Sequence, residues 1–175
     1  MAEAPRSSHP VDALIRELIR ARRDATTREI EEIIERVATA PFNPGRERVP
    51  TAERGLVYRG RIIRRDEDSL FRHLVKRVLL DRQWPVGTTE DQYLADLRGA
   101  VRASSVRLAV YQRRDGCMAA TLAHTDEAML PVQRGAAWLP ELLVVYSADR
   151  GMLISGYQVS GLETTGVPKG ARWLK

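Results

Sequence analysis

The spacing of apolar residues predicts helices in the first part of the chain and strands in the last part. Near the N-terminus, apolar residues recur every three or four positions, which predicts a helix from Pro10 to about Asp24. Thr26 and Glu29 have the spacing of a capping box, so a second helix is expected from there to Pro41. We expect the two to form a helical hairpin with these apolar positions: Val11, Leu14, Ile15, Leu18 and Ile19, then Ile30, Ile33, Ile34 and Val37.

The middle of the chain predicts two further helices. Residues 41–55 are rich in proline and charge and are expected to form a linker or surface loop, followed by a short strand over 56–63 that Gly60 weakens or bulges. Acidic residues 66–68 suit the start of a helix, which should run to about Gln83. Thr88, with Asp91 three residues later, predicts the N-cap of the next helix, which reaches about Val101.

From Val106 onward the apolar pattern alternates, as in strands. Residues 106–111 and 117–123 read as a hairpin around Asp115-Gly116, and a long loop is expected over 124–139. A second hairpin follows over 140–160, and Gly151 should take the positive φ of its turn. The first strand of that hairpin has no polar interruption and is expected to be central in the sheet. In the tail after Gly161, Trp173 and Leu174 are expected to dock on the body.

Helices followed by strands define the α+β class. The expected architecture is a helical hairpin plus two further helices, packed on a four- to five-stranded antiparallel β-meander. The chain divides into a tail and helical hairpin (1–45) and an α+β domain (46–175), or forms one continuous domain. The helices should cover one face of the sheet. The other face, or the groove between helix and sheet, would remain for function.

Positive charge is concentrated in two stretches. Residues 59–82 hold eight basic and four acidic residues, and residues 98–114 hold five arginines and no acid. Such stretches attract polyanions, above all RNA or other nucleic acid, although solvated faces of an arginine-rich protein look the same. The glutamates of the second helix would repel phosphates, which disfavours DNA reading by the helical hairpin.

Composition and motifs exclude several classes of protein. An apolar fraction of 43% and a charged fraction of 29% are typical of a globular protein. The sequence lacks a nucleotide-binding glycine loop, paired metal-ligand motifs, a nucleophile elbow and a long apolar run, so we expect no cofactor, no metal and no membrane span. The lone Cys117 and the polar N-terminus favour a reducing cytoplasm.

His73 is the strongest candidate for chemistry. It lies beside the apolar stripe of its helix, next to Lys76 and Arg77, and nearby cations favour the neutral imidazole that accepts a proton. On the strands, Arg107, Thr121 and a last-strand face with Leu153, Ser155 and Tyr157 offer groups that bind phosphate. The simpler interpretation is a surface histidine on an amphipathic helix and an ordinary solvent-facing strand.

Residues 66–160, a helix with a histidine, a helix and an antiparallel meander ending in L-V-V-Y-S-A-D-R-G-M-L-I-S-G-Y, resemble the metal-independent ribonuclease superfamily of barnase, EndoU, colicin and RelE types. The resemblance implies RNA cleavage without metal, with His73, Arg107, Ser155 and Tyr157 in catalysis. Substrate contacts would come from Lys76, Arg77 and Thr121. No second histidine or glutamate paired with His73 is evident in the sequence. The alternative is a non-catalytic interaction or nucleic-acid-binding module, with a homodimer through the N-terminal helices.

Overall fold

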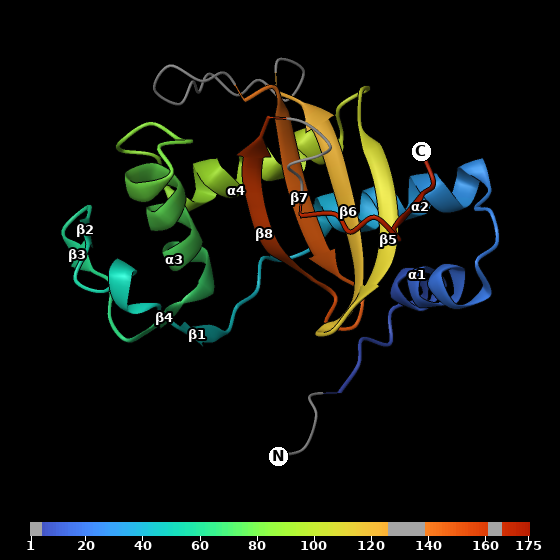
Figure 1. Cartoon of the computed structure of the whole chain (residues 1–175), viewed down its shortest axis with the longest axis horizontal. Coiled ribbons are helices and arrows are strands. Elements are labelled where there is room, and N and C mark those ends of the chain that lie inside the picture. Colours follow the sequence, from blue (N-terminus) through green and yellow to red (C-terminus); the bar gives the residue numbers. More distant parts are fainter. Residues whose placement is uncertain (1–4, 126–138, 161–165) are drawn as a thin grey trace.

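The structure is a computed structural model that describes residues 5–125, 139–160 and 166–175. Its centre is a five-stranded antiparallel sheet in the order β8-β7-β6-β5-β9, with helices on one side (Figure 1). This arrangement confirms the α+β class and the antiparallel sheet. The sheet strands are β5 (Arg107–Arg113), β6 (Gly116–His124), β7 (Glu141–Ser147), β8 (Met152–Val159) and β9 (Arg172–Trp173).

The helices begin at the caps that the sequence indicates, or one residue away. Helix α1 (Pro10–Ala21) has proline in its first turn, and α2 (Thr27–Thr39) starts with the capping box of Thr26 and Glu29. Helix α4 (Glu90–Val101) starts one residue later than expected, because Thr89 and Gln92 form its capping box. Helix α3 (Ser69–Val75) is capped by Asp68 and continues as a π-helical segment, η2 (Lys76–Leu80).

Helices α1 and α4 lie against the sheet, and α2 contacts both of them. The central residues of their apolar faces are fully buried, the flanking ones are partly buried, and the facing positions of the strands are buried. The largest core cluster therefore runs from α1 to β8, with members such as Ile15, Ile33, Leu97, Val144 and Leu153. Strand β7 is buried on both faces over Leu142–Ser147, which confirms its central position.

The β7–β8 hairpin turns at Gly151, whose φ of 72° is the positive value that the sequence indicates. The register shifts between Val145 and Tyr146, so that Ile154 is an extra residue in β8. Leu153 faces the helix-covered core, whereas Ser155 and Tyr157 oppose Val145 and Leu143 of the cluster on the other face. The expectation that Leu153 shares a face with Ser155 and Tyr157 is wrong, because a bulge inverts the alternation.

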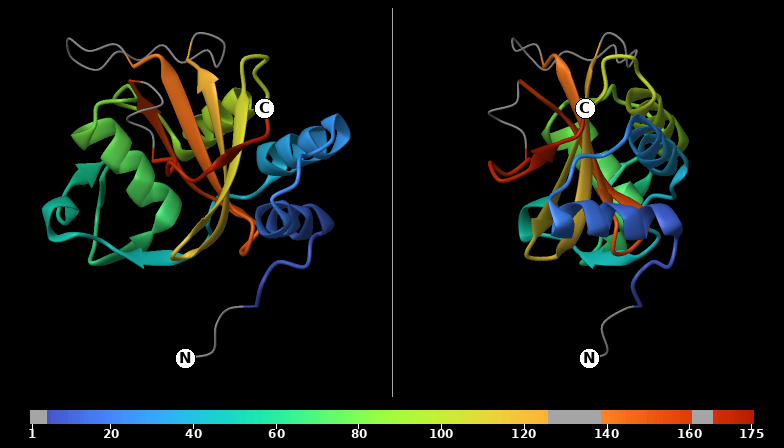
Figure 2. Two further views of the ribbon diagram at one scale, coloured as in Figure 1. Left: turned by 45° about the vertical axis from the view of Figure 1, so that its right-hand side comes forward. Right: turned by 90° about the vertical axis from the view of Figure 1, so that its right-hand side faces the viewer.

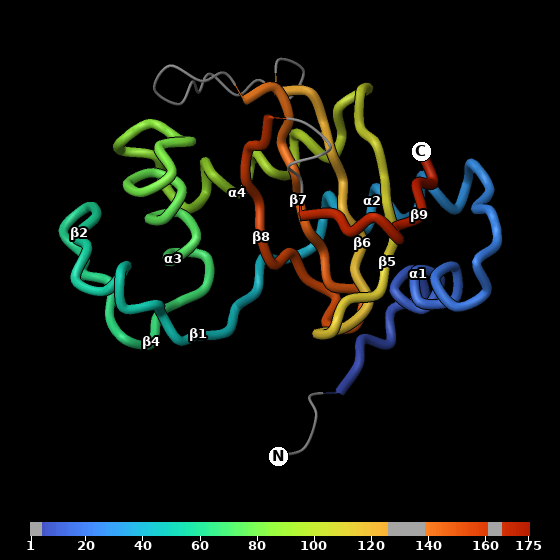
Figure 3. The backbone as a smooth tube through the Cα atoms, viewed as in Figure 1, coloured from blue at the N-terminus to red at the C-terminus, as the bar shows by residue number. Residues whose placement is uncertain are grey.

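The second face of the sheet is not open, contrary to the expectation. It carries a smaller apolar cluster, which includes Met118, Leu122 and Leu143, and Val167 and Ala171 pack against it. Residues 166–175 cross this face and pair with β5 as β9, on the opposite side from α4 (Figures 2 and 3). The tail docks as expected, through Trp173 in β9 and Leu174 against the main core.

Residues 41–68 differ most from the sequence prediction. The expected strand over 56–63 is instead two short strands, β2 (Val57–Tyr58) and β3 (Arg61–Ile62), because Arg59 and Gly60 both have positive φ and close a two-residue turn. The expected linker is docked structure with buried side chains: it contains β1 (Arg46–Arg48), paired with β4 (Asp66–Asp68), and the 3₁₀ turn η1 (Thr51–Glu53). Most of the long loop predicted over 124–139 lies outside the described residues.

Candidate functional site

His73 lies on α3 with a side chain only 12% exposed. Its ring packs edge-on against Phe42, with centroids 5.5 Å apart, and its buried Nδ1 has no hydrogen-bond partner among the described residues. Burial, and then the positive charges of Arg77, Arg72 and Lys76, lower the pKa of His73 to about 3. The ring is therefore neutral at neutral pH, as the base of the expected mechanism must be, but it is a weak base and is more buried than expected.

Next to His73 lies a glutamate, Glu47, that sequence reasoning missed. Oε1 of Glu47 lies 3.4 Å from Nε2 of His73 and accepts a hydrogen bond from Arg72 at 3.0 Å. Arg72 also holds Glu53 through two hydrogen bonds, at 2.8 and 3.1 Å. Glu47 comes from β1, 26 residues before the histidine, and its neighbourhood depends on the pairing of β1 with β4. No spacing rule connects these residues in the sequence.

Arg77 is brought together with two of the predicted last-strand residues. Its Nη2 lies 3.4 Å from Oγ of Ser155, and its guanidinium lies over the ring of Tyr157, 4.8 Å from the centroid. Nε donates to the Gly156 carbonyl at 3.1 Å, and Nη1 is paired with Asp81. Arg77 is 7% exposed and much of its donor capacity is used, so it serves first to close the free edge of β8.

Arg107 lies on the same sheet face as Tyr157, but at the far end of one row. The row runs from Tyr157 through Leu143 and Leu122 to Arg107, across three strand spacings or about 14 Å. Arg107 is exposed and its guanidinium lies over the Trp173 ring at 4.4 Å. Arg107 is therefore not brought together with His73 or Ser155.

Two predicted substrate contacts have very different positions. Thr121 is 1% exposed on the helix-covered face of β6, between Leu108 and Val144, and cannot touch a ligand in this state. Lys76 is partly exposed at the start of η2, and its charge contributes to the lowered pKa of His73.

The stretch over 98–114 does not form one surface. Arg98 donates to the Ala40 carbonyl, Arg102 pairs with Glu35, and Arg107 lies on the opposite side of the sheet. Arg113 lies at the β5–β6 turn and pairs with Asp115. These arginines therefore act as separate local contacts.

The first part of the other basic stretch, residues 59–68, belongs to a protruding unit, residues 46–68, which we call the basic lobe. It lies beyond α3, on the opposite side of the molecule from α1 and α2 (Figure 1). Its acids Glu53 and Glu67 are buried against arginines, and Asp68 caps α3. Its exposed charges are Asp66 and six arginines: Arg46, Arg48, Arg59, Arg61, Arg64 and Arg65.

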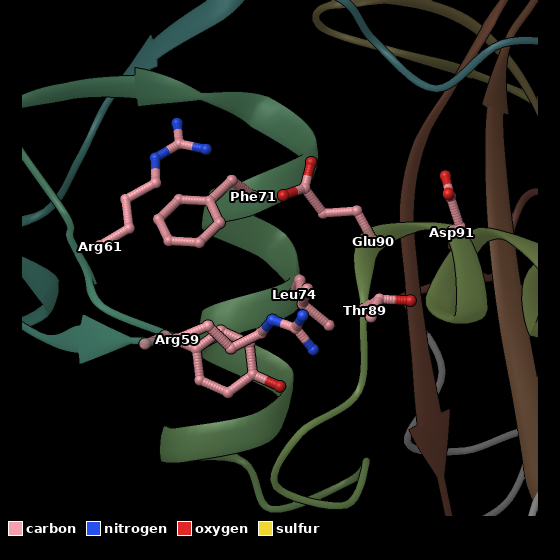
Figure 4. Close-up of a pocket in the computed structure, with 8 residues that line it drawn as sticks. Arg59, Arg61, Phe71, Leu74, Thr89, Glu90 and Asp91 are labelled. Carbon is pink, nitrogen blue, oxygen red and sulfur yellow. The ribbon is translucent and has the colours of Figure 1, made fainter.

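Two of the hollows in the described part of the chain lie next to Glu47 or to the β2–β3 hairpin. One of about 200 Å³ lies beside Glu47 and the β7–β8 bulge, with Asn43, Arg150 and Ile154 in its wall. The other, of about 400 Å³, lies between the β2–β3 hairpin and the start of α4 (Figure 4). Neither is lined by His73, Arg77, Arg107, Ser155 or Tyr157.

Within residues 5–125, 139–160 and 166–175, no group of three or more His, Cys, Asp or Glu side chains is placed to hold a metal ion. The helices in these ranges are too short or too polar to cross a membrane. Comparison of the chain with protein-family models, curated proteins and solved structures finds no match. The ribonuclease resemblance therefore stays a prediction that rests on the residues quoted for it.

Proposed function

We propose that the protein is a nucleic-acid-binding module that contacts phosphates through the basic lobe. The observation that carries this proposal is the sorting of charge in the lobe, where buried acids leave six arginines exposed beside one exposed acid. Arginine forks bind phosphate oxygens, and clustered positive charge raises the association rate. Of the two hypotheses from the sequence, this non-catalytic one fits the geometry better, since Arg107 lies three strands away from Tyr157 and is not brought together with His73 or Ser155.

The test is binding to fluorescent RNA and DNA oligonucleotides as a function of salt. Arg64→Ala/Arg65→Ala should weaken binding and reduce the slope of log K against log salt by up to about 2, because each lost phosphate contact removes about one released counterion. Arg20→Ala/Arg28→Ala removes two exposed arginines outside the lobe and is the matched control. Equal losses in both variants, or no binding at low salt, would contradict the proposal.

RNA cleavage without metal is the second candidate, and one observation favours it. His73 has a glutamate neighbour, Glu47, and Glu47 lines a hollow of about 200 Å³. A carboxylate and an imidazole together can move a proton to and from a ribose hydroxyl. Cleavage in the presence of a chelator should then fall at least tenfold in both Glu47→Gln and His73→Gln. Background-level activity in all three proteins would exclude this candidate.

For the N-terminal helices we propose a role within the chain, as a helical hairpin packed on the sheet. The apolar stripe that a homodimer would use is occupied, since Ile15, Leu18, Ile33 and Val37 are fully buried. Light scattering of the protein as it elutes from a size-exclusion column measures its molar mass. A concentration-independent monomer mass is expected, and a dimer that dissociates when α1 is altered would restore the homodimer hypothesis.

A further inference from the structure

The 400 Å³ hollow beside α4 has a floor of almost fully buried apolar side chains (Figure 4). Phe71 and Leu74 of α3 and Tyr58 of β2 form it. The Tyr58 hydroxyl donates to the Thr88 carbonyl at 2.6 Å and accepts from the Gly87 amide at 3.1 Å, so the hairpin is tied to the segment before α4. The volume lies in the range of small-molecule sites.

The two walls of this hollow carry opposite charge. Arg59 and Arg61 extend from the β2–β3 hairpin, and Glu90 and Asp91 from the start of α4 (Figure 4). Arg61 pairs with Glu67 and lies over the Phe71 ring at 3.9 Å, and Arg59 donates to the Gly87 carbonyl at 2.8 Å. In the described ranges no ion pair joins the two walls.

The acidic wall has more negative than positive charge around it. Burial, and then the charge of Asp68, raise the pKa of Glu90; the charge of Arg61 acts against this rise, and Asp91 and Glu67 add to it. The backbone N–H of Gln92 already donates a hydrogen bond to Oγ1 of Thr89, at 3.2 Å, in the capping box. The start of α4 therefore offers a carboxylate for a cation, and an anion would be held by Arg59 across the hollow.

We propose that this hollow binds a small zwitterion of the α-amino-acid class, either a free amino acid or a dipeptide. Its ammonium group lies against Glu90, its carboxylate accepts from Arg59, and an apolar side chain contacts the edge of the floor that Phe71 and Leu74 line, beside the Arg61 guanidinium. A phosphate-bearing ligand would meet Glu90 and Asp91, and a purely cationic ligand would meet Arg59 and Arg61. Only a ligand with both charges and an apolar body matches all three surfaces.

The test is calorimetric titration of the wild-type protein with L-leucine, L-phenylalanine and L-alanyl-L-phenylalanine. At least one should bind. N-acetyl-L-phenylalanine, which lacks the ammonium group, and L-phenylalaninamide, which lacks the carboxylate, should each bind about tenfold more weakly than L-phenylalanine, since each loses one charge-assisted contact. Absence of binding for all three zwitterions to the folded protein overturns the proposal.

Two variants connect any binding to this hollow. Glu90→Gln should weaken zwitterion binding about tenfold but leave the binding of N-acetyl-L-phenylalanine unaffected. Arg59→Gln should also weaken zwitterion binding about tenfold but leave the binding of L-phenylalaninamide unaffected. Glu31→Gln and Arg28→Gln, on the exposed face of α2, are the matched controls and should bind as wild type. Circular dichroism confirms folding. If Glu90→Gln still prefers L-phenylalanine over N-acetyl-L-phenylalanine as strongly as the wild-type protein does, the proposal is overturned. The Arg64→Ala/Arg65→Ala protein should bind zwitterions normally, which separates this site from nucleic-acid binding.

Discussion

Arg36 donates a hydrogen bond to the carboxylate of Asp12 over 2.9 Å, and this pair joins α2 to α1 at the β7–β8 turn. The carboxylate is fully buried, and the hydroxyls of Ser7 and Tyr146 also donate to it. A buried charge is tolerated only when such partners replace water. This network holds the turn end of the β7–β8 hairpin against α1 and α2.

Removal of the Asp12 charge should destabilise the protein and change its response to acid. Burial acts to raise the pKa of Asp12, but the hydrogen bonds from Arg36, Ser7 and Tyr146 outweigh it and hold that pKa below its usual value near 3.8. The stabilisation is therefore present above about pH 4 and is lost as pH falls through the lowered pKa. Asp12→Asn should lose about 3 kcal/mol at pH 7 and less at pH 3. Urea unfolding at both pH values measures this, and an equal loss at both would contradict it.

Gly151 should tolerate alanine far less well than another glycine with the same backbone conformation. A Cβ at Gly151 would lie 2.9 Å from Nη2 of Arg36 and 3.1 Å from Oδ2 of Asp12, whereas one at Gly55 would meet nothing within 4 Å. Both residues have positive φ, 72° and 83°. Gly55→Ala should cost about 1 kcal/mol, the price of the backbone alone, and Gly151→Ala at least about 1 kcal/mol more. Thermal unfolding of the two variants decides; equal losses would show that the ion pair moves aside.

Gly156 tests the packing between β8 and α4. A Cβ at this position would overlap with Cδ2 of Leu97, which is fully buried. Gly156→Ala should cost about 1–3 kcal/mol through overpacking. Leu97→Val removes one methylene, so the double variant should lose less stability than the sum of the two single variants. Additive losses in chemical denaturation would show that the strain arises in the backbone of β8 and not at Leu97.

The sequence predicts those parts of the fold that depend on local rules. The capping box of Thr26, the turn at Gly151 and the central strand β7 each follow from residues a few positions apart. Residues 41–68 escape prediction because their structure depends on pairings between distant segments, such as β1 with β4. The pattern of alternation also fails at Ile154, where a bulge that no residue type signals turns Ser155 and Tyr157 to the other face.

The candidate site shows the same division. The cations that help to keep His73 neutral lie close to it in the sequence and could be read from it, but burial, the larger cause of its lowered pKa, could not. Its burial by Phe42 and its contact with Glu47 come from a segment outside the helix, so the sequence could not place them. Arg107 and Tyr157 face the same side of the sheet, but strand order separates them.

The lowered pKa of His73 predicts a loss of stability in mild acid. The unfolded chain protonates this histidine near pH 6.5, whereas burial and the neighbouring cations keep the folded ring neutral down to about pH 3. Between these values the unfolded state binds the extra proton, so stability falls as pH falls, by at most about 1.4 kcal/mol per pH unit. Glutamine carries no charge, so the free energy of unfolding of His73→Gln should depend less on pH between 6 and 4.5. Urea denaturation at half-unit steps of pH gives both slopes, and identical slopes for His73→Gln and wild type would mean that the folded ring accepts a proton as readily as the unfolded chain.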